Sequence, residues 1–246
     1  MLIVANWKAY VDDLAKAKKL VTVSKRLARE HQSIIVIAPP APLLGALAVR
    51  PSSVAFAAQD VSLSSGGAQT GEITVGAYKA AGAAYALIGH SERRAQGDTD
   101  AVVAQKLAHA LTNGLTPILC VGERERDGEG RYLTFVREEL TSALAPLTPK
   151  DRARVIVAYE PLWAIGKTSA FAIDPHDLTE MALYIRKVLT ELLPGKSAAS
   201  SLVLYGGSVD PDDARVLAAS SGIDGLLVGH ASTDPRLFSL LVKQLA

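Results

Sequence analysis

The chain has 246 residues, of which 49% are apolar and 21% charged, so it is long enough to bury a large core. Its net charge of +1 shows no overall attraction to nucleic acid or to an anionic membrane, and no apolar stretch is long enough to span one. The single cysteine, Cys120, excludes an intramolecular disulfide and a cysteine-cluster metal site, and the N-terminus shows no signal segment, so we expect a soluble, cytoplasmic protein.

Short apolar runs alternate with helical patterns along the whole chain. In chain order, the sequence predicts a strand at 2–7, a helix at 12–30, a strand at 34–38, a helix at 43–49, a strand at 54–59, a helix at 74–82, a strand at 85–88 and a helix at 99–113. The second half continues with a strand at 116–121, a helix at 132–144, a strand at 155–160, a helix at 175–193 that Asp174 begins, a strand at 202–205, a helix at 211–219 capped by Asp210, a strand at 223–228 and a helix at 235–245.

These eight strand-helix units predict an α/β fold. Nearly continuous apolar strands indicate burial on both faces, which is typical of parallel sheets. Eight such units in 246 residues with no composition break favour a single-domain (β/α)8 TIM barrel over residues 1–246. A doubly wound open sheet is the alternative, but no Gly-x-Gly-x-x-Gly follows the first strand to support it.

Polar residues follow several of the predicted strands at their carboxyl ends, where the active sites of such barrels lie. They are Asn6, Lys8, His90, Glu160, Gly206-Gly207-Ser208 and Gly229-His230. Each has an ordinary reading by itself: a strand-end lysine is usually a solvated charge, a lone histidine a hydrogen-bonded structural residue, and a Gly-Gly pair a turn. Their joint placement at one rim favours a catalytic site.

The stretch around Glu160 carries the strongest local signal. Glu160 ends an apolar strand, Pro161 follows it, and Tyr159, Leu162 and Trp163 surround it. Such neighbours would partly remove the carboxylate from water, which suits a general base. A helix cap or a paired surface glutamate is the alternative from these residues alone.

Two glycine-containing turns indicate an anion site. Gly206-Gly207-Ser208 and Gly229 precede predicted helices, where free backbone N–H groups favour phosphate. Gly166-Lys167-Thr168 is similar to the end of a nucleotide-binding P-loop, but Pro161 stands where that motif needs glycine. No metal or redox cofactor motif occurs, so we expect side-chain acid-base chemistry without a cofactor or metal.

The chain resembles the triosephosphate isomerase family in several stretches that follow the family's order. They are Ala5-Asn6-Trp7-Lys8, Gly71-Glu72-Ile73, Ile88 through His90-Ser91-Glu92-Arg93-Arg94, Cys120-Val121-Gly122-Glu123, residues 158–166, and Tyr205-Gly206-Gly207-Ser208-Val209. The resemblance implies a cofactor-independent isomerase that interconverts dihydroxyacetone phosphate and glyceraldehyde 3-phosphate, a step of glycolysis and gluconeogenesis.

By this resemblance, Glu160 is the base, His90 polarises the substrate oxygens, Lys8 stabilises negative charge and Asn6 helps to hold the substrate. Glu92 is implied to support Lys8. Three further positions, Gly166, Ser208 and Gly229, resemble phosphate-binding positions, and His230 would lie beside them.

Two departures from the family pattern bear on the substrate. Lys167 follows Gly166 at once and residues 168–171 precede the next helix, whereas the family usually continues with Thr-Gly-Lys. His230 replaces the second glycine that usually follows the eighth strand, so its side chain would either crowd the phosphate or add a contact to it. These departures motivate one alternative, an isomerase of a longer phosphorylated ketose. A second alternative, a non-catalytic barrel that binds phosphorylated metabolites, would require loss of a reacting group, and none of Asn6, Lys8, His90 or Glu160 is lost.

The polar loop at 62–74 is longer than an ordinary connection, and such loops are usually functional or disordered. The resemblance implies that it inserts into a second subunit, where Thr70 would reach the partner's Asn6 and Lys8. We therefore expect a homodimer with a small phosphorylated sugar as substrate, and no nucleic-acid or membrane partner. Cys120 follows apolar Ile118 and Leu119 and is expected to pack in the core rather than act as a nucleophile.

Overall fold

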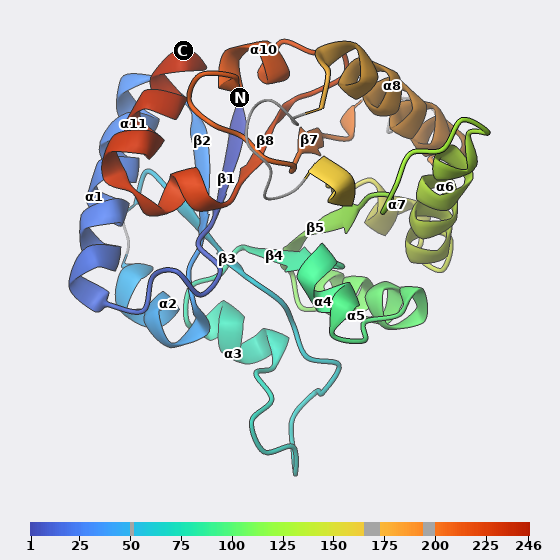
Figure 1. Ribbon diagram of the computed structural model, residues 1–246. Coiled ribbons are helices and arrows are strands. Elements are labelled where there is room, and N and C mark those ends of the chain that lie inside the picture. The colour runs from blue at the N-terminus through green and yellow to red at the C-terminus, as the bar shows by residue number, and fades with distance from the viewer. Residues whose placement is uncertain (50–51, 165–172, 194–199) are drawn as a thin grey trace.

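All eight predicted strands form, and they close into a parallel barrel. The computed structural model describes residues 1–49, 52–164, 173–193 and 200–246, and within them each strand pairs with its neighbours in chain order, with β1 next to β8 (Figure 1). The strands are β1 (Leu2–Asn6), β2 (Ile34–Ala38), β3 (Ala55–Ala58), β4 (Tyr85–Ile88), β5 (Thr116–Val121), β6 (Ile156–Tyr159), β7 (Val203–Tyr205) and β8 (Gly225–Val228). The prediction of a (β/α)8 barrel is confirmed.

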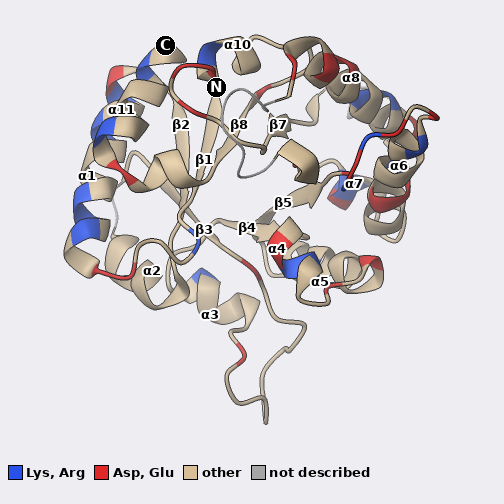
Figure 2. Cartoon of the chain, in the orientation of Figure 1, with Lys and Arg blue, Asp and Glu red and all other residues tan. Residues whose placement is uncertain are grey.

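Helices surround the barrel (Figure 1). The long ones are α1 (Leu14–Glu30), α5 (Asp100–Thr112), α6 (Arg131–Leu144), α8 (Pro175–Leu192) and α11 (Pro235–Gln244). The short ones are α2 (Ala41–Leu47), α3 (Val75–Ala80), α4 (Ser91–Ala95), α7 (Pro149–Arg152), α10 (Ala214–Ala218) and the 3-10 turns η1 (Leu162–Ala164) and η3 (His230–Thr233). Charged residues of both signs lie on these outer helices (Figure 2). No helix within the described residues is long and apolar enough to cross a membrane.

Side chains alternate between two apolar cores, because successive residues of a strand point to opposite faces. The inner core fills the barrel with residues such as Leu2, Val4 and Ala158, while Ile3 and Ala5 belong to the outer core under the helices. The same alternation carries Asn6 and Glu160 to the inner face, one step beyond the last apolar layer. The polar residues therefore sit at the carboxyl-terminal mouth of a filled barrel.

The predicted helix at 211–219 starts too early in the chain. It begins at Ala214, and residues 211–213 form a turn instead. Asp210 is not the cap: its backbone N–H donates to the Asp213 carboxylate at 2.8 Å, so the second aspartate closes the turn. By contrast, Asp174 begins α8 as predicted and accepts a hydrogen bond from the His176 N–H at 2.8 Å.

Two short helices, α4 and α7, were not predicted. Each has only four or five residues, which is too short for helical periodicity to show in the sequence. The N-terminus of α7 is capped by Thr148, whose hydroxyl accepts from the Asp151 N–H. The α4 helix matters more, because it starts directly after His90.

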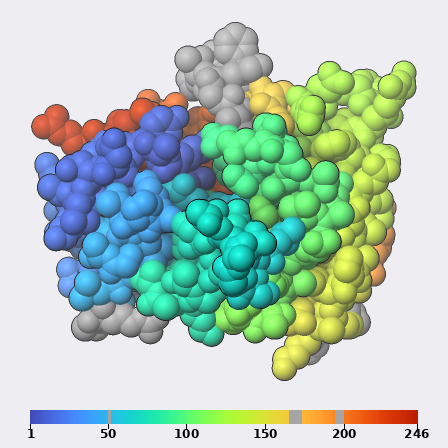
Figure 3. All heavy atoms as spheres, turned by 90° about the horizontal axis from the view of Figure 1, so that it is seen from below, coloured from blue at the N-terminus to red at the C-terminus, as the bar shows by residue number. Residues whose placement is uncertain are grey.

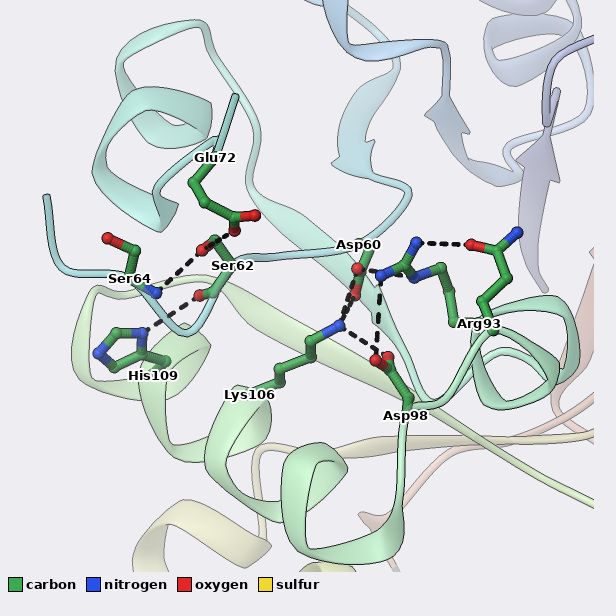
Figure 4. Close-up of polar contacts among 9 residues, drawn as sticks. Asp60, Ser62, Ser64, Glu72, Arg93, Asp98, Lys106 and His109 are labelled. Carbon is green, nitrogen blue, oxygen red and sulfur yellow. Dashed lines mark hydrogen bonds and ion pairs between the residues drawn. The ribbon is translucent and has the colours of Figure 1, made fainter. Parts of the chain in front are cut away.

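The loop after β3 projects away from the barrel (Figure 1), and its atoms lie at the front of the view from below (Figure 3). It has internal structure: Ser62 bonds the Glu72 carboxylate, and the Ser62 carbonyl lies 3.3 Å from His109 Nδ1 on α5 (Figure 4). At its root, the buried Lys106 ammonium lies 2.8 Å from Asp60 and 2.7 Å from Asp98. The described loop is thus anchored at its base while residues 65–70 are exposed.

Candidate active site

A cavity of about 560 Å³ opens at the carboxyl ends of the strands. It is lined by Asn6, Lys8, Tyr10, His90, Glu92, Glu160, Gly206, Gly207, Ser208, Val209, Asp210, Leu227, Gly229, His230 and Ala231. Every candidate site residue that the structure describes is in this lining except Thr70, which lies on the exposed loop. Gly166 and the departure at 167–171 lie outside the described residues.

Glu160 and His90 meet inside the cavity. Glu160 Oε1 lies 3.3 Å from His90 Nε2, and Glu160 Oε2 accepts the Ser91 backbone N–H at 3.2 Å. Both side chains are buried, with exposed fractions of 3% for Glu160 and 8% for His90. A carboxylate and an imidazole this close can act on neighbouring atoms of one small molecule.

The surroundings of His90 fix which ring nitrogen carries the proton. His90 is the N-cap of α4, and its Nδ1 accepts the Glu92 backbone N–H at 3.2 Å. A nitrogen that accepts a hydrogen bond is unprotonated, so the neutral ring carries its proton on Nε2, which faces Glu160. The ring can therefore donate Nε2–H to an oxygen in the cavity.

Glycines let the neighbouring strands close around Glu160. The Glu160 N–H donates to the Val121 carbonyl at 2.8 Å, and the Gly206 N–H to the Tyr159 carbonyl at 2.7 Å. A Cβ at Gly122 would come within 2.0 Å of the Glu160 carbonyl oxygen, and one at Gly206 within 2.9 Å of Glu160 Cγ. Neither position has room for a side chain while Glu160 stays where it is.

Lys8 is held in a backbone conformation that is rare for a residue other than glycine. Its φ is 46°, its N–H donates to Asn6 Oδ1 at 3.1 Å, and its carbonyl accepts from Gln59 Nε2 at 2.8 Å. Such strain persists only when the surrounding contacts impose it, and it concentrates at functional sites. The conformation brings the ammonium into the cavity.

The Lys8 ammonium donates to Glu92 Oε1 at 2.8 Å. Burial acts to raise the pKa of Glu92, but the hydrogen bond and the charge of Lys8 outweigh it, so the pKa lies below its usual range. Glu92 therefore stays ionised and orients Lys8.

The turns after β7 and β8 form the neighbouring wall of the cavity, where a Cβ at Gly229 would lie 3.9 Å from Lys8 Cε. In the first turn, a Cβ at Gly207 would come within 2.2 Å of the Tyr205 hydroxyl, so the Gly-Gly pair allows close packing. In the second, Gly229 precedes η3, and the exposed His230 ring packs edge-on against Tyr10, with ring centroids 5.6 Å apart. The imidazole lies at the rim of the cavity.

The structure adds three supporting residues that the sequence did not reveal. Tyr10 lines the cavity, and Gln59 ties the backbone of β2 to that of Lys8 by donating to the carbonyls of Ala38 and Lys8. Buried Glu123 accepts hydrogen bonds from the Tyr159 hydroxyl and the Trp163 indole, both at 2.8 Å. Of the three, only Gln59 could have been suspected from the sequence, because it is a polar residue at the carboxyl end of a predicted strand.

Cys120 is fully buried in the inner core. Burial, together with the nearby Glu160 charge, raises the pKa of its thiol well above the usual value, which argues against a nucleophile. Among the described residues, no group of three or more His, Cys, Asp or Glu side chains has the arrangement of a metal site.

Comparison with known proteins gives one consistent result. The family model described as triosephosphate isomerase matches residues 1–245. The chain is 38% identical to the triosephosphate isomerase of Moorella thermoacetica, over 98% of this chain and 97% of that protein. It is 39% identical to that of Pelobacter propionicus, over 98% and 97%, and 37% identical to that of Coprinopsis cinerea, over 96% and 94%.

Proposed function

The chain belongs to the triosephosphate isomerase family, and from this premise we propose that Glu160 and His90 carry out the family's reaction at the mouth of the barrel. That reaction is the interconversion of dihydroxyacetone phosphate and glyceraldehyde 3-phosphate, an aldose-ketose isomerisation. We place it in glycolysis and gluconeogenesis.

Glu160 would act as the base. It takes a proton from C1 of dihydroxyacetone phosphate, the electron pair forms a C1–C2 double bond, and the carbonyl oxygen takes up the negative charge. The proton of the C1 hydroxyl then passes to the C2 oxygen, which leaves the negative charge on the C1 oxygen. The carboxylic acid returns its proton to C2 as the C1 oxygen becomes the aldehyde carbonyl. A proton next to a carbonyl is weakly acidic, so the site must stabilise the enediolate more than the substrate.

His90 would stabilise the charge on the two oxygens and carry the proton between them: its Nε2–H gives a proton to the C2 oxygen, and Nε2 then takes up the proton of the C1 hydroxyl. The observation that supports this most is its Nδ1, which accepts the Glu92 N–H and so leaves Nε2–H directed at the cavity beside Glu160. A neutral imidazole beside a glutamate base is the division of roles already described for triosephosphate isomerases. In this chain the contacts of His90 support the same roles.

Other residues that line the cavity would hold the rest of the substrate. We propose that the Lys8 ammonium, oriented by Glu92, stabilises the enediolate and that Asn6 helps to place the oxygens. Ser208, Gly229 and His230 line the same cavity and would contact the phosphate. Gly166 stays a prediction for the same role.

The test is a coupled assay with glyceraldehyde 3-phosphate on the wild type and on Glu160→Gln. Removal of a positioned base should lower kcat by about 10²–10⁴-fold, while phosphoglycolate still binds. The matched control is Glu138→Gln, the same chemical change at an exposed position of α6, which should leave kcat unchanged. Full activity in Glu160→Gln would exclude Glu160 as the base.

His230 also motivates the alternative substrate, a longer phosphorylated ketose, because its side chain stands at the cavity rim where the family usually has glycine. Turnover of triose and tetrulose phosphates by the same preparation separates the two. We expect the triose phosphate to be preferred, and negligible triose turnover would favour the alternative.

We also propose a homodimer that forms through the loop at 62–74. This loop stands clear of the barrel (Figure 1), is anchored at its root and exposes Leu63 and Ile73, which are 40% and 39% exposed. Docking would place Thr70 next to the partner subunit's Asn6 and Lys8. Light scattering after size-exclusion chromatography should give the dimer mass, whereas a fully active monomer would contradict the proposal.

The remaining proposals are general ones. Residues 1–246 would form one domain, because one barrel and one outer core run through all the described segments. We propose a cytoplasmic enzyme without a nucleic-acid or membrane partner, in keeping with the near-neutral net charge and with the single, buried cysteine.

A further inference from the structure

A buried ion pair lies behind the cavity, outside its lining. Arg94 on α4 and Glu139 on α6 approach to 3.3 Å between Nη1 and Oε1. Their side chains are 16% and 6% exposed. Neither residue contacts the cavity, so a role in the reaction has to act through other residues.

Arg94 holds the end of β4. Its Nε donates to the Gly89 carbonyl at 2.8 Å, and Gly89 directly precedes His90. Gly89 has a φ of 74°, which turns the chain sharply between β4 and the N-cap of α4. The guanidinium therefore fixes the backbone from which His90 projects.

Glu139 holds the end of β5 in the same way. Its Oε2 accepts the Gly122 N–H at 2.8 Å, in a buried hydrogen bond. Gly122 packs directly against the backbone of Glu160, because a Cβ there would lie 2.0 Å from the Glu160 carbonyl oxygen. Any shift of Gly122 toward Glu160 would therefore move the Glu160 backbone.

We propose that Arg94 and Glu139 are positioning residues, a clamp that sets the separation of His90 and Glu160 by holding Gly89 and Gly122. The inference rests on the proposed roles of His90 and Glu160. The clamp would link the strands that carry these two side chains, whose Nε2 and Oε1 atoms lie 3.3 Å apart.

The clamp depends on pH, because the negative charge of Glu139 is buried and burial of a charge lowers the stability of the fold. Burial raises the pKa of Glu139 to about 7, against the opposing effect of Arg94. The other ionisable groups that face it are Asp100, Glu123 and the Cys120 thiol. Protonation of Glu139 removes its ion pair with Arg94, while Arg94 Nη1 keeps its ion pair with Asp100 Oδ1 at 2.6 Å. The clamp therefore weakens on the Glu139 side as the pH falls through about 7.

The test is Glu139→Gln. The matched control is Glu138→Gln, which makes the same change at the exposed preceding position of α6. Active sites are counted by titration with phosphoglycolate, so that unfolded protein does not enter kcat. We expect kcat to fall about 10-fold, since a misplacement of about 1 Å costs on the order of 10²-fold and the loss of the clamp should cause a smaller one. KM should stay within about twofold. The kcat ratio of wild type to variant should rise between pH 6 and pH 8.

A kcat within about twofold of the wild type at pH 8, or a lowered kcat whose ratio does not change with pH, would overturn the proposal. If Glu139→Gln does not fold, Arg94→Lys tests the clamp from the other side, because lysine keeps the charge but cannot hold Gly89 and Glu139 together. It should show the same loss of kcat, and an unchanged kcat overturns the proposal.

Failure of the clamp is separable from failure of the proposed function. If Glu160→Gln is inactive while Glu139→Gln is fully active, only the clamp is wrong. If Glu160→Gln keeps its activity, the assignment of the base is wrong.

Discussion

Gly206 offers a direct test of how closely Glu160 is placed. An added methyl group in Gly206→Ala would lie 2.9 Å from Glu160 Cγ and 3.3 Å from Leu227 Cδ2. Ordinary carbon contacts begin at 3.4 Å, so the carboxylate side chain must move by at least the difference of 0.5 Å. The φ of Gly206 lies outside the left-handed region, so alanine brings no backbone strain of its own.

The expected loss follows from this displacement. A misplacement of about 1 Å costs on the order of 10²-fold in rate, so half of it should lower kcat by about 10-fold. Overpacking against Leu227 should also lower the free energy of unfolding by about 1–3 kcal/mol. The coupled assay gives kcat and KM, and urea unfolding at the assay temperature gives the stability.

The matched control is Gly128→Ala, because a Cβ at Gly128 meets nothing within 4 Å and its φ is also outside the left-handed region. Both variants carry one added methyl, and only the one at position 206 contacts Glu160. If Gly206→Ala keeps kcat within about twofold of the control, the position of Glu160 does not limit the reaction and the reasoning is refuted.

Three further outcomes follow from the charged groups of the site. As the pH rises from 4.5 to about 7, the stability of the wild type relative to Glu139→Gln should fall by about 3 kcal/mol, because native Glu139 keeps a proton that the unfolded chain has lost; urea unfolding at several pH values should show this, and an unchanged difference would contradict it. In Lys8→Met, the pKa of Glu92 should rise, since the ammonium that lowers it is gone, and a carbon NMR titration measures this. His230→Gly should raise KM by up to about fivefold with kcat kept, the effect of one hydrogen bond of about 1 kcal/mol, and a large fall in kcat would show a different role.

The sequence predicted those features of the site that depend on strand ends. Asn6, His90 and Glu160 each follow an apolar run, and the carboxyl ends of parallel strands must meet at one rim, so their convergence needed no coordinates. The helix at 211–219 was misplaced because Asp210 and Asp213 are both good caps and the local sequence does not decide between them.

The residues that hold the site in place could not be predicted. In the sequence, Glu139 looks like any other charged residue of a helical pattern. Its partners Arg94 and Gly122 are 45 and 17 positions away along the chain. Gly122 and Gly206 appear as ordinary turn glycines until the distance of a Cβ to Glu160 is measured. These contacts arise only when neighbouring strands and helices pack.

The energetically unfavourable features of the site all lie at one end of the barrel, so the apolar layers below them can offset the lost stability. Lys8 has a strained φ of 46°, Glu160 is a buried carboxylate, and the pKa of Glu139 is raised to about 7, so each would be more stable elsewhere. The layers below contain apolar side chains such as Val4, Leu87 and Ile118, all fully buried. Relative to the wild type, Glu139→Gln should therefore be more stable at pH 8 than at pH 4.5, although its loss of kcat is larger at pH 8. A residue with a purely structural role would not produce this opposition.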